Sequence, residues 1–138
     1  DFCLSRGLGD VYKRQRIGRG RIKSICGIDF EEYDALIIPG GIGLLNNYRV
    51  SSTIEACIAH FSSRKKPIAT MCAGIDFMRR FLGGSLLEHE TNVLTAEKFC
   101  FDADNNIYYT PAFRKTNSCY TAGLGIGSMI YALKLRFL

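Results

Sequence analysis

The chain has 138 residues, 47% of them hydrophobic and 22% charged, which is enough apolar sequence for one globular domain and too little for two. No stretch approaches the roughly 18 uninterrupted apolar residues of a membrane span, so we expect no membrane partner. The formal charge of +5 arises within residues 1–23, which hold seven basic and two acidic residues, whereas the other 115 hold 11 of each. A neutral body without a nucleic-acid-binding motif excludes a dedicated nucleic-acid protein from the expected classes.

The six cysteines are spread singly, without a C-x-x-C pair, and only two histidines accompany them. This pattern does not indicate a zinc site, and the amount of apolar sequence removes the need for disulfides. No signal peptide with an apolar segment is visible. We therefore expect reduced thiols in an intracellular protein, cytoplasmic or in the mitochondrial matrix, with no metal and no cofactor.

Residues 1–15 show neither helical nor strand periodicity and resemble a translated sequencing adapter. We expect this head to lie outside the fold, as an adapter-like or disordered segment. Residues 16–138 are then predicted to form one partial domain.

The regular elements begin with a short helical turn at Asp29, followed by a buried strand over 34–39 that ends in a glycine-rich turn. Apolar residues at helical spacing predict a helix of about three turns from Ser52. A second strand over 67–71 leads directly into a helix that ends near residue 82. Strand, helix, strand, helix is the order of a parallel α/β sheet.

The second half of the chain has a different pattern. Two strand-like runs, 98–101 and 107–110, flank a polar turn and predict a β-hairpin. A last helix is predicted over 118–135. Gly123 and Gly127 lie in the middle of that helix, where no phosphate loop can form, so we expect them to mark a face that another element approaches closely.

Cys72 stands at the junction of the second strand and its helix. A turn at that position lifts one side chain to the carboxyl edge of the sheet, and the free N–H groups and dipole of the helix favour a thiolate. The turn resembles a nucleophile elbow with Cys in place of Ser. We predict Cys72 as the nucleophile; the alternative is that it is a small core residue.

The glycine loop after the first strand lies at the same predicted edge. Backbone N–H groups of Gly40, Gly41 and Ala73 are candidates for an oxyanion hole and for substrate binding. A general base is harder to identify: His60 is expected in solvent, and His89 is a weak candidate that a loop would have to bring back to Cys72. No complete triad is visible.

Four segments resemble the ES1/ElbB branch of the DJ-1/PfpI, class I glutamine amidotransferase-like superfamily: 16–23 (RIGRGRIK), 34–43 (DALIIPGGIG), 66–72 (KPIATMC) and 109–113 (YTPAF). The resemblance implies a flavodoxin-like three-layer sandwich with a mainly parallel sheet, often dimeric, with Cys72 in the elbow. It also implies a glutamate acid/base in the first strand-helix unit, and this chain contains no such Asp-Gly-x-Glu-like segment. The sheet is therefore expected to lack that unit.

The resemblance implies a glyoxalase-like enzyme that acts on a small carbonyl substrate, converting a 2-oxoaldehyde to a 2-hydroxy acid, or a related cysteine-dependent hydrolase. A non-catalytic, redox-responsive or chaperone-like protein is the alternative. An amidotransferase glutaminase ranks last, because it requires a His-Glu pair near its end and no histidine follows His89.

Overall fold

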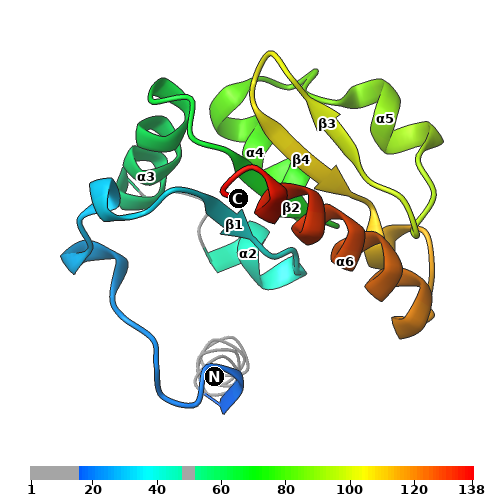
Figure 1. The fold of residues 1–138 in the computed structure, drawn as a ribbon, viewed down its shortest axis with the longest axis horizontal. Coiled ribbons are helices and arrows are strands. Elements are labelled where there is room, and N and C mark those ends of the chain that lie inside the picture. Colours follow the sequence, from blue (N-terminus) through cyan, green and yellow to red (C-terminus); the bar gives the residue numbers. More distant parts are fainter. Residues whose placement is uncertain (1–15, 48–51) are drawn as a thin grey trace.

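The computed structural model describes residues 16–47 and 52–138, which are arranged around a four-stranded sheet of order β1-β2-β4-β3 (Figure 1). The strands are β1 (Leu36–Ile38), β2 (Ile68–Met71), β3 (Cys100–Asp102) and β4 (Ile107–Thr110). β1, β2 and β4 are parallel, and β3 runs antiparallel to β4. The predicted strands and the predicted hairpin are confirmed.

The helices are α2 (Ile42–Asn47), α3 (Ser52–Ser63), α4 (Gly74–Leu82), α5 (Glu88–Val93) and α6 (Cys119–Leu135), with short 3₁₀ turns η1 (Ile25–Gly27), η2 (Phe30–Glu32) and η3 (Ala112–Arg114). The sequence predicts α3, α4 and α6, and Ser118 caps α6 by accepting from the Thr121 N–H at 3.2 Å. It does not predict α2 or α5, which are only six residues long and too short to show a helical period. No helix in the described ranges is long and apolar enough to cross a bilayer.

Apolar residues on both faces of the sheet give it a helix layer on each side, which is the expected flavodoxin-like sandwich. On one face Ile68, Tyr109 and Phe77 form a core with α3 and α4. On the other, Ala69 and Tyr108 pack against α6. These pairs agree with the register, in which Thr70 lies beside Tyr109 and Ala69 beside Tyr108. β1 pairs only with β2 among the described strands and forms one edge of the sheet.

Two expectations are corrected. Gly123 and Gly127 are exposed, and a Cβ at either would meet no heavy atom within 4 Å; the close approach occurs instead at Gly125, whose Cβ would lie 2.2 Å from the Ala96 carbonyl oxygen. His60 is not fully solvated, because its ring packs against Phe30 and Phe61 and its side chain is only 19% exposed. The head over 1–15 lies outside the described residues.

Candidate functional site

Cys72 occupies the turn between β2 and α4 with φ +52°, the left-handed region that non-glycine residues rarely adopt. The Cys72 N–H donates to the Thr110 carbonyl oxygen at 3.0 Å, so the turn is tied to the end of β4. The side chain is partly exposed. The thiol therefore stands in a strained bend at the carboxyl edge of the sheet, the position that a nucleophile elbow requires.

Gly40 brings the loop after β1 against this bend. A Cβ at Gly40 would lie 2.5 Å from the Met71 carbonyl oxygen, 2.8 Å from Cys72 Cβ and 3.0 Å from the Ala73 nitrogen. Only a residue without a side chain permits this approach. The two segments that the sequence places at one edge are therefore in direct contact.

Gly74 fixes the start of α4 in the same way. A Cβ there would lie 2.1 Å from Thr70 Oγ1 and 3.0 Å from the Ile38 carbonyl oxygen, and Thr70 Oγ1 donates to that carbonyl at 3.3 Å. The threonine hydroxyl thus joins β2 to β1 beneath the first turn of the helix. The N–H groups of that turn have no intrahelical partner, because every α-helix leaves its first N–H groups free.

The candidate oxyanion groups have different surroundings. The Ala73 nitrogen lies 3.0 Å from the point that a Cβ of Gly40 would occupy, so the backbone of the glycine loop reaches the start of α4 next to Cys72. Gly41 is exposed and has φ +127°, a conformation that requires glycine. The role of all three as oxyanion donors stays a prediction.

His89 lies on α5, which begins after Leu87 in a left-handed conformation. Its side chain is exposed, and it makes no hydrogen bond or ion pair with another residue in the described ranges. No interaction therefore connects this candidate base with Cys72. Within 16–47 and 52–138, no group of three or more His, Cys, Asp or Glu residues could hold a metal ion.

A charged and phenolic cluster lies beside the elbow, and two of its members, Tyr109 and Arg114, were missed by the sequence reasoning. Asp76, in the first turn of α4, forms ion pairs with Arg79 at 3.3 Å and with Arg114 in η3. The Tyr109 ring is fully buried, and burial raises the pKa of its phenol, while Arg114 lies near enough to lower it and Cys72 and Asp76 raise it further. Tyr109 lies within a quoted segment, but nothing in the sequence indicates that its hydroxyl reaches this site.

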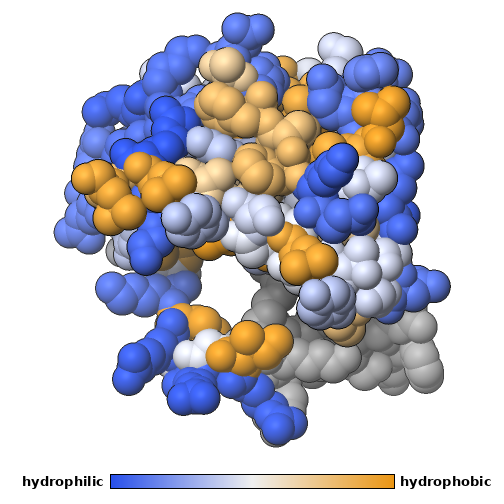
Figure 2. Space-filling view, turned by 45° about the vertical axis from the view of Figure 1, so that its right-hand side comes forward, coloured by the Kyte–Doolittle hydropathy of each residue, from blue (hydrophilic) through white to orange (hydrophobic). Residues whose placement is uncertain are grey.

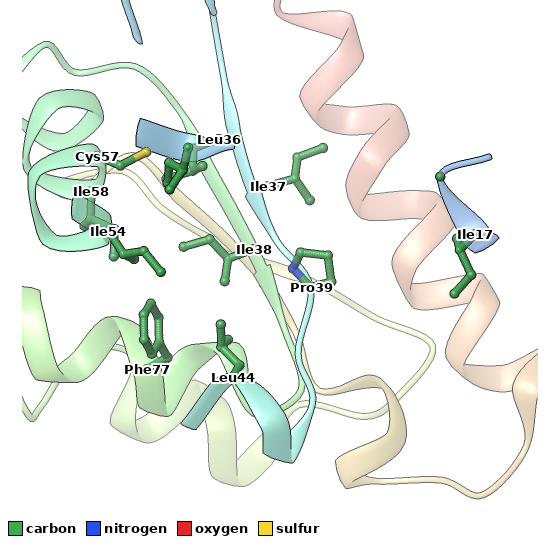
Figure 3. Close-up of a pocket in the computed structure, with 12 residues that line it drawn as sticks. Ile17, Leu36, Ile37, Ile38, Pro39, Leu44, Ile54, Cys57, Ile58 and Phe77 are labelled. Atoms are coloured by element: carbon green, nitrogen blue, oxygen red, sulfur yellow. The ribbon is translucent and has the colours of Figure 1, made fainter. Parts of the chain in front are cut away.

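The apolar pocket of about 550 Å³ lies elsewhere, along β1, and its lining includes Ile38, Leu44, Ile54, Ile58 and Phe77 but not Cys72. These side chains converge from β1, α2, α3 and α4, whereas Ile37 points to the opposite side of the strand, toward α6 (Figure 3). The surface is hollowed between the N-terminal segment and the rest of the molecule (Figure 2). The pocket has the character of an uncovered core, and it offers no group for catalysis beyond the Cys57 thiol, whose pKa is raised by burial.

Comparisons with known proteins support the DJ-1/PfpI superfamily assignment and the fold. The model of the DJ-1/PfpI family matches residues 14–81. The chain is 26% identical over 149 residues to the ES1 protein homolog, mitochondrial, of Rattus norvegicus, across 83% of this chain and 56% of that protein. It therefore spans little more than half the length of this curated relative.

A solved structure shows the same fold. The crystal structure of an isoprenoid biosynthesis protein with an amidotransferase-like domain from Ehrlichia chaffeensis matches with a TM-score of 0.79 and 25% identity. The match covers 91% of this chain and 69% of that chain.

Proposed function

Because the chain belongs to the DJ-1/PfpI superfamily, we propose that it serves as the Cys72-bearing part of a glyoxalase-like enzyme, which converts small 2-oxoaldehydes to 2-hydroxy acids. One observation carries the proposal: the partly exposed Cys72 sits at φ +52° in direct contact with the Gly40 loop. This contact supports the proposal because it would bring a nucleophile and backbone donors for the charge it creates to one place.

The proposed reaction needs no oxidant and no cofactor. The Cys72 thiolate adds to the aldehyde carbon, and the new C–S bond leaves a negative oxygen that the N–H groups of Gly40, Gly41 and Ala73 would stabilise. A proton then moves from the former aldehyde carbon to the neighbouring carbonyl carbon with the help of an acid/base, giving a thioester. Water cleaves the thioester, releases the 2-hydroxy acid and returns the thiol, so the net change is the addition of one water.

The acid/base is the incomplete part of the site. In the resembled family it is a glutamate of the first strand-helix unit, which this sequence does not contain, and His89 is the remaining weak candidate. We therefore expect low turnover from the printed chain. A chain extended with such a unit is the better enzyme for the test.

The test is lactate production from methylglyoxal by the extended chain, by Cys72→Ser and by the control Cys119→Ser, which removes an exposed thiol at the start of α6. We expect loss of turnover only in Cys72→Ser. Equal turnover by all three proteins would remove Cys72 from the mechanism. No turnover by any of them would leave the proposed enzymatic activity without support.

The second candidate function is a redox-responsive or chaperone-like role, which is favoured by the lack of any described interaction between Cys72 and a histidine. A thiolate attacks peroxide, and one oxygen joins the sulfur as a sulfenic acid while hydroxide leaves. Peroxide should then oxidise Cys72 before the other cysteines, and an added thiol should reduce the oxidised Cys72 again. Uniform oxidation of all cysteines would exclude this role.

We also propose a homodimer in an intracellular compartment, cytoplasmic or the mitochondrial matrix. The edge of the sheet at β1, which has no second strand partner among the described residues, and the apolar pocket beside it support association, because apolar surface of this kind marks contacts. Light scattering during gel filtration tests the oligomeric state, and a monomer at micromolar concentration would exclude the dimer.

A further inference from the structure

The cluster of Tyr109, Asp76 and Arg114 beside Cys72 has a role that neither the elbow nor the glycine loop accounts for. The Tyr109 side chain is 0% exposed, and its hydroxyl forms no hydrogen bond of ordinary geometry; the Arg114 guanidinium lies close enough to lower the pKa of the phenol, but it only donates, so the hydroxyl proton has no acceptor among the described residues. Buried hydroxyls are rarely left without a partner. An orphaned phenol at a candidate active site therefore indicates that a ligand atom supplies the partner.

The position of the phenol is set by the sheet. Tyr109 lies beside Thr70 in the register, two residues before Cys72, and the next residue, Thr110, accepts the Cys72 N–H. Tyr109 and Thr70 belong to the face covered by α4, so the ring runs beneath the helix that begins after Cys72. Cys72 lies close enough to raise the pKa of the phenol, and the two groups make no hydrogen bond. The thiol and the phenol are therefore neighbours at this edge of the sheet.

The charge at this place is positive. Two arginines, Arg79 and Arg114, share the single carboxylate of Asp76. Arg79 is also bound to the Leu86 carbonyl at 2.8 Å and to Thr91 Oγ1 at 3.1 Å, so its position is fixed. Arg114 has Asp76 as its one ion-pair partner among the described residues and otherwise lies near the Tyr109 hydroxyl, so one guanidinium charge stays uncompensated.

The Arg114 side chain lies near the Tyr109 phenol, and its ion pair with Asp76 can be broken at little cost. The Asp76 and Arg114 side chains are 31% and 35% exposed, and ion pairs exposed to this extent are weak. When Arg114 turns to an incoming anion, Arg79 still neutralises Asp76. The free N–H groups at the start of α4 favour an anion at the same place.

We propose that Arg114 and Tyr109 form a carboxylate-binding subsite beside Cys72, so that the preferred substrates are reactive carbonyl compounds that carry an acidic group. Arg114 provides the charge, and the Tyr109 hydroxyl donates a hydrogen bond that selects a carboxylate oxygen. This substrate class rests on the proposed function, whereas the subsite itself requires only a reactive Cys72 thiol.

The test compares two alkylating reagents of nearly equal size, iodoacetate and iodoacetamide. In both, the Cys72 thiolate forms a C–S bond and iodide leaves, but only iodoacetate carries a carboxylate. Rates at each cysteine are measured on the printed chain by peptide mass spectrometry, with the exposed Cys26 as the internal reference. We expect the iodoacetate-to-iodoacetamide ratio to be severalfold higher at Cys72 than at Cys26.

Variants identify the source of the preference. Arg114→Gln and Tyr109→Phe should each lower the ratio at Cys72, Arg114→Gln by about fivefold, which is the size expected for a partly exposed charge. The control Arg80→Gln removes an exposed arginine of α4, whose side chain donates to the Leu45 carbonyl, and should leave the ratio unchanged. Arg114→Gln alters a surface residue and should fold, so it still tests the subsite if Tyr109→Phe does not fold.

Equal ratios at Cys72 and Cys26, or an equal decrease in Arg80→Gln and Arg114→Gln, would overturn the subsite. If the iodoacetate-to-iodoacetamide ratio is higher at Cys72 than at Cys26 but methylglyoxal is not converted, the subsite is supported and the proposed enzyme is refuted. Methylglyoxal turnover with equal iodoacetate-to-iodoacetamide ratios at Cys72 and Cys26 would support the enzyme and refute the subsite.

Discussion

Replacing Gly40 by alanine tests the contact on which the candidate site depends. The added Cβ would lie 2.5 Å from the Met71 carbonyl oxygen and 3.0 Å from the Ala73 nitrogen, and both are backbone atoms that cannot rotate away. Ordinary contacts need about 3.5 Å, so the loop must retreat from the elbow by about 1 Å. We expect a loss of about 1–3 kcal/mol in the free energy of unfolding, the usual cost of overpacking. A displacement of this size at a reacting centre also costs on the order of 10²-fold in turnover.

The assay combines urea unfolding with the rate of iodoacetamide alkylation at Cys72. Gly123→Ala is the matched control, because Gly123 is an exposed glycine of α6 with no heavy atom within 4 Å of an added Cβ. Alanine there should raise the free energy of unfolding by about 0.5–1 kcal/mol through its helix propensity and leave Cys72 unchanged. If Gly40→Ala matched the wild type in both stability and Cys72 reactivity, the direct contact between loop and elbow would be refuted.

Two further outcomes are expected. Gly125→Ala should destabilise the protein by more than 1 kcal/mol, because the added Cβ would lie 2.2 Å from the Ala96 carbonyl oxygen and 2.7 Å from Thr110 Oγ1. Gly127→Ala should not destabilise it, because the added Cβ meets no heavy atom within 4 Å. Equal melting temperatures for the two variants would contradict the packing of α6. Burial, followed by the charges of Glu90 and Asp102, raises the pKa of Cys100 from 9.0 to about 11, so the thiol stabilises the fold fully below pH 9 and that contribution is lost as pH rises to about 11. Cys100→Ser should reduce this pH-dependent loss in the free energy of unfolding, measured by urea unfolding, by on the order of 1 kcal/mol. The same loss in both proteins would show that Cys100 does not titrate in this range.

The sequence was sufficient for most of the architecture because its signals are local. The strand before Gly40, the helix after Cys72 and the helix capped by Ser118 each follow from apolar spacing and from capping or turn residues, and the structure has all three. The elbow follows from the same reasoning, since a strand that leads directly into a helix must turn at Cys72. Short helices such as α5 do not contain enough residues to show a period.

Glycine shows where local reasoning ends. Gly123 and Gly127 have the spacing of a packed helix face, yet the close contact is at Gly125. Which side of α6 meets the sheet depends on the strands beneath it, and the helix is apolar on nearly every side. The pattern within the helix therefore could not choose the face.

The sequence by itself determined the order of strands and helices, the position of Cys72 at a turn and the glycine loop that follows β1. Only the tertiary structure decided that Gly40 touches the elbow, that His89 faces solvent, and that Tyr109 and Arg114 come together near the start of α4. The physical reason is that the first set depends on the conformation of neighbouring residues. The second depends on residues that are about 30 to 40 positions apart or more, and for the elbow they are brought to one edge of the sheet by the pairing of β2 with β1 and with β4.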